Sequence, residues 1–126
     1  MRRYTNSSLA VVTAFAALAS ASAHAQAVFV NEIHYDNVGT DAGEAIEIAG
    51  PAGTSLAGWT VVLYNGAPGQ FNVYDTDALS GTIPNLGAGH GVVTLNYASN
   101  GIQNGSPDGI ALVDASNNVV QFLSYE

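Results

Sequence analysis

Apolar residues beyond residue 26 occur in short runs separated by glycine-rich stretches, and this pattern constrains the fold more than any other feature. Within the runs, apolar side chains alternate with polar ones or follow one another directly, as they do in strands. No apolar stripe with the period of a helix extends far enough to predict one. The runs lie at 27–36, 44–49, 59–64, 74–79, 91–97, 109–114 and 119–125. Seven short strands with turn signals between them predict an all-β fold, an immunoglobulin-like antiparallel β-sandwich.

Three local patterns add detail to this prediction. Strict alternation in the first run would place Val28, Val30, Glu32 and His34 on one face of its strand. Trp59 has the size to anchor the core, since truncating such a buried ring costs about 3–5 kcal/mol. The runs at 109–114 and 119–125 flank a loop at 115–118, which is typical of a β-hairpin.

Residues 1–25 are predicted to be a signal peptide. Arg2 and Arg3 form its positive start, and residues 9–18 form an apolar stretch shorter than the roughly 20 residues that span a bilayer. Residues 23–25 (AHA) match a cleavage site, with cleavage expected after Ala25. An uncleaved membrane anchor is the alternative interpretation. We therefore expect a secreted, periplasmic or cell-surface product whose single domain spans 26–126, with no transmembrane segment after cleavage.

Removing this segment leaves a strongly acidic domain. Both basic residues of the chain lie in it, so losing two positive charges takes the formal charge from −8 to −10. Nucleic-acid binding by the remaining segment is therefore not expected, because Lys and Arg supply the phosphate contacts. Divalent cations and basic protein surfaces remain acceptable partners. The chain has no cysteine, so core burial and a possible metal ion must provide the stability.

The stretch 36–44 (DNVGTDAGE) combines carboxylates and an amide with glycines. Oxygen ligands on a bendable loop suit Ca²⁺, so Asp36, Asp41 and Glu44 are the predicted calcium ligands. Asp75 and Asp77 are separated by one residue in a later run, so both would face the same side of that strand. They could join the three predicted ligands. The spacing differs from that of an EF-hand. The alternative is a solvated acidic turn in which Asp and Asn bond to their own backbone.

The sequence does not indicate a catalytic site. Glu32, Glu44 and Glu47 could supply a glycosidase acid and base, but nothing in the sequence places two of them across a cleft. His34 and His90 are too few for a typical three-ligand zinc site. The segment beyond residue 25 also lacks a cysteine nucleophile and a lysine. We therefore expect a domain that is not itself an enzyme.

Four motifs occur in order along the chain, at residues 31–35 (NEIHY), 43–48 (GEAIEI), 56–59 (LAGW) and 109–114 (GIALVD). Taken together, they resemble a lamin-tail domain. Together they extend from about residue 28 to the end of the chain. The sequence departs from the family at Ala45, where an aromatic residue is more usual.

The resemblance implies an immunoglobulin-like sandwich that serves as an accessory module on secreted bacterial proteins, especially ahead of extracellular nuclease or phosphatase-type domains. No catalytic residues come with it. The last run reaches the end of the chain, so we expect a fragment whose sandwich lacks its last strand or strands. The expected function is binding, positioning or attachment through an unknown protein or surface ligand. The alternative is the N-terminal part of a secreted nuclease or phosphoesterase whose catalytic domain lies beyond Glu126.

Overall fold

The computed structural model describes residues 27–126, so the predicted signal peptide lies outside the described residues. Residues 27–126 form seven strands, and each begins and ends within two residues of a predicted run. The strands are β1 (Phe29–His34), β2 (Ala45–Pro51), β3 (Thr60–Asn65), β4 (Asn72–Ala78), β5 (His90–Asn96), β6 (Asp108–Val113) and β7 (Val119–Tyr125).

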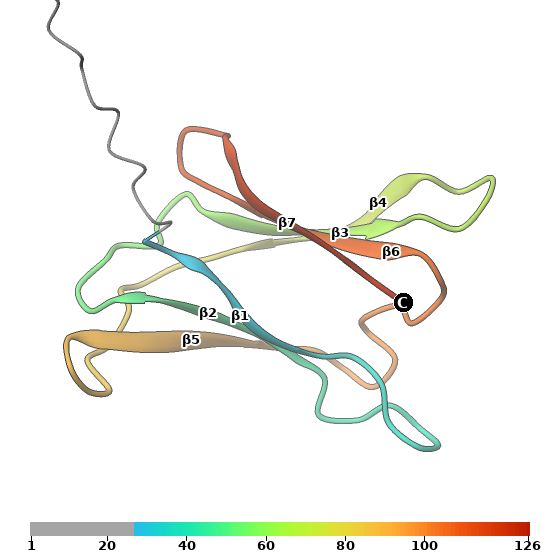
Figure 1. Cartoon of the computed structure of the whole chain (residues 1–126), viewed down its shortest axis with the longest axis horizontal. Helices are drawn as coiled ribbons and strands as arrows, with labels where there is room; N and C mark the ends of the chain where they lie inside the picture. Colours follow the sequence, from blue (N-terminus) through green and yellow to red (C-terminus); the bar gives the residue numbers. More distant parts are fainter. Residues whose placement is uncertain (1–26) are drawn as a thin grey trace, which may run out of the picture.

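The strands form two antiparallel sheets packed against each other, as Figure 1 shows. One sheet has the order β1-β2-β5 and the other has the order β4-β3-β6-β7. The predicted all-β antiparallel sandwich is confirmed, and so is the hairpin, because β6 pairs with β7 across the loop at 115–118. In this part of the chain there is also no helix of the length and apolarity needed to span a bilayer.

The core between the sheets is aliphatic. It draws on alternate residues of the central strands and on single residues from the connections. The large fully buried strand residues are Ile46, Ile48, Val61, Leu63, Ile110 and Leu112, and Leu56, Ile83 and Ile102 join them from loops. Burying each such side chain contributes about 1.5–3 kcal/mol. Trp59 packs against this cluster but stays partly exposed, so the centre of the core is filled by aliphatic side chains instead of the indole ring.

A β-bulge in β1 changes which side chains face the core. Val30 pairs with Ile48, but the next pair along β1 is Glu32 with Glu47, so Asn31 is an extra residue. An extra residue reverses the alternation beyond it. Val30 is buried and Ile33 packs against the core, whereas Glu32 is exposed on the outer face. The predicted grouping of Val30 with Glu32 on one face is therefore wrong.

The loops gather at the two ends of the sandwich (Figure 1). One end carries the β1–β2, β3–β4 and β5–β6 loops, at 35–44, 66–71 and 97–107. The other end carries the β2–β3, β4–β5 and β6–β7 loops, at 52–59, 79–89 and 114–118. The predicted calcium loop and the glycine-rich stretch before β5 therefore lie at opposite ends.

Three tyrosines connect the sheets and loops at the first of these ends. The Tyr97 hydroxyl, next to β5, donates to Asp77 Oδ2 of β4 over 2.6 Å. Tyr125 donates to the Gln103 carbonyl oxygen over 2.9 Å, and the Tyr74 oxygen accepts from Gln103 N–H over 3.0 Å. Burial, together with the Asp77 carboxylate, raises the pKa of Tyr97 above its usual range. Burial and the bond with Tyr74 raise the pKa of Tyr125 in the same way.

These tyrosines predict a loss of stability in alkali. Above about pH 10 a phenol in the unfolded chain loses its proton, whereas the raised pKa values keep Tyr97 and Tyr125 protonated in the folded chain. The folded state then binds more protons than the unfolded state, so the free energy of unfolding falls as the pH rises. Below about pH 10 both states are protonated and this contribution is fully present.

The substitution Tyr97→Phe should make that alkaline fall shallower, because it removes one of the phenols whose pKa is higher in the folded chain than in the unfolded chain. Urea unfolding followed by circular dichroism, repeated from about pH 8 to about pH 11, measures the slope. A slope in the Tyr97→Phe chain equal to that of the unchanged chain would contradict the prediction.

Candidate functional site

The predicted calcium ligand Glu44 is a buried structural carboxylate. It lies just before β2 and is fully buried. Its Oε2 accepts from Gly101 N–H over 2.7 Å and its Oε1 accepts from Ile102 N–H over 3.3 Å. Both oxygens thus take backbone donors from the β5–β6 loop. A carboxylate buried without a cation needs such bonds, because removing a charge from water is otherwise strongly unfavourable.

Asp41 has a similar role, and Asp36 does not. Asp41 is 6% exposed, its Oδ1 accepts from Asn37 N–H over 2.9 Å, and its Oδ2 accepts from the Asn104 side-chain amide over 3.0 Å. Asn37 also donates to the carbonyl oxygen of Ala42 over 2.9 Å. Asp36 is exposed at the start of the loop. Side-chain bonds to the loop backbone are what the alternative interpretation, an acidic turn, expected.

Residues 27–126 contain no group of three His, Asp or Glu side chains placed to hold a metal ion. The structure therefore does not gather Asp36, Asp41 and Glu44 into one ligand set, and calcium binding stays a prediction. Asp75 and Asp77 share a face, as predicted, since they pair with Leu63 and Val61 on the core side of β3.

The two histidines of residues 27–126 lie at opposite ends of the three-stranded sheet. His34 pairs with Ala45, the first residue of β2, and His90 pairs with Pro51, the last. The His34 ring bonds within the β1–β2 loop, with Nδ1 3.0 Å from the carbonyl oxygen of Gly43. The structure thus separates the histidines, and His90 lies beside a hollow.

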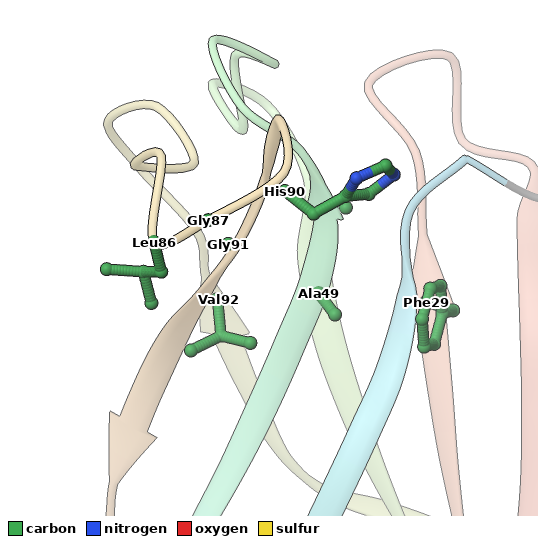
Figure 2. A pocket seen from close by; sticks show the side chains of 8 residues that line it. Phe29, Ala49, Leu86, Gly87, His90, Gly91 and Val92 are labelled. Carbon is green, nitrogen blue, oxygen red and sulfur yellow. The ribbon is translucent and has the colours of Figure 1, made fainter.

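This hollow, of about 290 Å³, lies on the outer face of the three-stranded sheet near the start of β5 (Figure 2). Ala49 of β2 and Val92 of β5, which pair across the sheet, form its floor. Phe29 of β1 lies on one side and Leu86, from the β4–β5 loop, on the other, with His90 where β5 begins. The other lining residues are Gly50, Gly87 and Gly91. Leu86 is 68% exposed and Phe29 is 37% exposed, so both present apolar surface to solvent.

The hollow forms because residues 86–90 turn back beside the start of β5. Leu86 N–H donates to the His90 carbonyl oxygen over 2.8 Å, and His90 N–H donates to that of Gly87 over 2.9 Å. A Cβ atom on Gly91 would clash with the carbonyl oxygen of Pro84, so a glycine is needed where this segment passes β5. These contacts hold Leu86 at the rim, and the neighbouring glycines leave the floor uncovered.

Two carboxylates lie on the same outer face, next to the hollow. Glu32 and Glu47 are direct partners across β1 and β2, and Glu47 pairs with Thr94 of β5 on its other side. Like charges placed directly opposite each other disfavour strand pairing. The Asn31 side-chain amide donates to Glu47 Oε2 over 3.2 Å, and this hydrogen bond offsets part of the repulsion between the two carboxylates. The outer face therefore has an apolar part followed by an anionic part.

A second apolar region covers the outer face of the four-stranded sheet. Phe122 and Val119 of β7 are exposed there, and the Phe122 ring packs against Tyr64 with centroids 5.8 Å apart. The same ring lies over Gly109, where a Cβ atom would come within 2.8 Å of it. The Phe122 ring thus covers the backbone of Gly109, which has no side chain of its own. The exposure of Phe122 is therefore explained by packing within the sheet. We therefore take the hollow beside Leu86 as the candidate site.

Sequence reasoning missed this hollow. Its lining comes from three strands and a loop far apart in the chain, so no local motif contains it. One available signal was the stretch 86–91 (LGAGHG), in which a leucine and a histidine stand among glycines. His90 of this stretch was weighed as a zinc ligand, not as part of an apolar surface.

Replacement of Glu44 by Gln tests the structural role of this carboxylate. Glu44→Gln should lower the free energy of unfolding by about 1–3 kcal/mol, because an amide NH₂ group would replace one acceptor of a buried backbone N–H. The matched control is Glu32→Gln on the surface, which should not lower stability by more than about 0.5 kcal/mol. Urea unfolding measures both values, and equal stability of the two variants would contradict the assignment.

No family model, curated protein or solved structure matches this chain. The fold is therefore described from its own strands, as two antiparallel sheets packed into a sandwich. The resemblance to the lamin-tail domain rests on the sequence motifs alone.

Proposed function

We propose that the chain supplies a secreted, non-catalytic module of lamin-tail type, with an immunoglobulin-like sandwich, that attaches or positions a longer exported protein by binding a protein partner. The binding surface is the outer face of the three-stranded sheet. Export follows from the predicted signal peptide at 1–25, and the accessory role follows from the sequence motifs. The hollow between Phe29 and Leu86 is the observation that carries the proposal.

Several properties of this hollow suit recognition of a partner. Its floor belongs to hydrogen-bonded strands, so it is preformed and requires little ordering on binding. Exposed Leu86 and Phe29 leave water when a partner covers them, which contributes about 25 cal/mol for each Å² of apolar surface buried. A few residues in a well-packed, desolvated pocket carry most of the binding energy at many interfaces, and this hollow can form such a pocket when a partner side chain fills it.

The test is retention of the chain on cell envelopes of the bacterium that produces it. We expect the unchanged chain to sediment with the envelopes and Leu86→Ser to reduce the bound fraction roughly tenfold, since one apolar anchor contributes about 1.5–3 kcal/mol. Phe29→Ser should act in the same direction.

Val119→Ser is the matched control, because Val119 is 59% exposed but lies on the other sheet. It should leave retention unchanged. Equal retention of the Leu86→Ser and Val119→Ser chains would contradict the proposed binding face, and so would hydrolysis of nucleic acids or phosphoesters by the purified chain.

A further inference from the structure

We infer that the outer face of the three-stranded sheet binds an extended basic segment of the partner, in which a bulky apolar residue is followed two positions later by Lys or Arg. This inference rests on the proposed function and specifies its partner. It comes from the position of the hollow relative to Glu32 and Glu47, and from the charge of the domain.

The hollow has room for one apolar side chain. Its volume of about 290 Å³ is at the lower end of the range for pockets that hold whole small molecules. It is open on the outer face, and the polar side chain that lines it, His90, is exposed. Such a shape suits the end of a leucine, phenylalanine or tryptophan side chain that belongs to a larger partner.

The spacing on β2 fits a partner in extended conformation. Ala49 on the floor of the hollow and Glu47 are two residues apart on the same strand and face the same side. Two residues of a strand span about 6.6–6.8 Å, and side chains two apart in an extended segment point the same way. A segment lying antiparallel to β2, with its apolar side chain over Ala49, therefore brings the second following side chain over Glu47.

The charge at this second position favours a cation. Glu32 and Glu47 face each other across the strands, and both belong to a segment that contains no Lys or Arg from residue 27 onward. A cationic side chain that pairs with these two carboxylates must come from another molecule or from another part of a longer chain. An Arg guanidinium can bond to both, because its fork of N–H donors matches carboxylate geometry.

The two parts of the site have different roles. Exposed ion pairs add little affinity, so the apolar side chain in the hollow provides most of the binding. The carboxylate pair selects among partners, because a segment with Glu or Asp at the second position would be repelled. Long-range attraction between the acidic domain and a basic partner also speeds association and weakens as salt is added.

Titration of the ¹⁵N-labelled chain with a capped peptide, Thr-Trp-Thr-Arg-Thr, tests the inference by NMR. We expect shifted amide signals along both parts of the site, at Phe29, Val92, Glu47 and Thr94, and unchanged signals around Phe122. Replacing Trp by Ala should abolish the response. Replacing Arg by norleucine should weaken binding roughly threefold to tenfold in low salt, and Glu should weaken it further.

Variants of the chain separate charge from folding. The double variant Glu32→Gln with Glu47→Gln should bind the Arg peptide as weakly as the unchanged chain binds the norleucine peptide, and its affinity should lose most of its salt dependence. Its melting temperature should be equal or higher, because two repelling charges are removed. The single exposed variant Glu32→Gln gives the same test with the smallest change to the fold.

The outcomes distinguish the inference from the proposed function. Equal affinity for the Arg and norleucine peptides, or unchanged binding by the Gln variants, overturns the basic-segment inference. If Leu86→Ser still reduces envelope retention in that case, the binding face stands and its partner is not basic. Signals of Glu32 and Glu47 that respond to Ca²⁺ alone, and not to the peptide, would also overturn the inference.

Discussion

The fold depends on carboxylates that are buried without any cationic side chain to pair with. Residues 27–126 contain no Lys or Arg, yet Glu44 and Asp108 are almost completely buried. Both oxygens of each accept backbone N–H groups: Glu44 from Gly101 and Ile102, and Asp108 from Gly66 and Gly105. Burying an unpaired charge is otherwise unfavourable by several kcal/mol. The loops at this end of the sandwich are therefore held in the one arrangement that supplies these donors.

The other end of the sandwich is built differently. There the chain uses glycines and the turn at 86–90 in place of buried carboxylates, and the result is an open hollow instead of a cross-linked set of loops. The bulge at Asn31 changes the same outer face further along the sheet. It turns Glu32 outward, on the same face as Phe29 and opposite Glu47, while Ile33 fills the core. One extra residue in β1 thus joins the anionic pair to the hollow.

The positions of the strands along the chain follow from local patterns, whereas the site does not. All seven runs became strands, and the 115–118 hairpin formed, because alternation and turn residues act over a few neighbours. Face assignment failed at Asn31, since a bulge depends on pairing with β2 and leaves no local signal. The same limit applies to the loop at 36–44. Its carboxylates would look the same in the sequence if they bound Ca²⁺ or if, like Glu44, they accepted hydrogen bonds from backbone N–H groups 57 and 58 residues away.

The pair of Glu32 and Glu47 lowers the stability of the sheet, and in the proposed complex it selects a basic partner. Either residue could be neutral without loss to the core, because both side chains point away from it. A like-charged pair opposite each other weakens the β1–β2 contact, so its presence has no explanation within the sandwich. Sequences that fold well tend to break local rules at functional sites, where another interaction compensates. The position of the pair, one strand repeat from an exposed apolar hollow, is where such compensation by a basic partner would act.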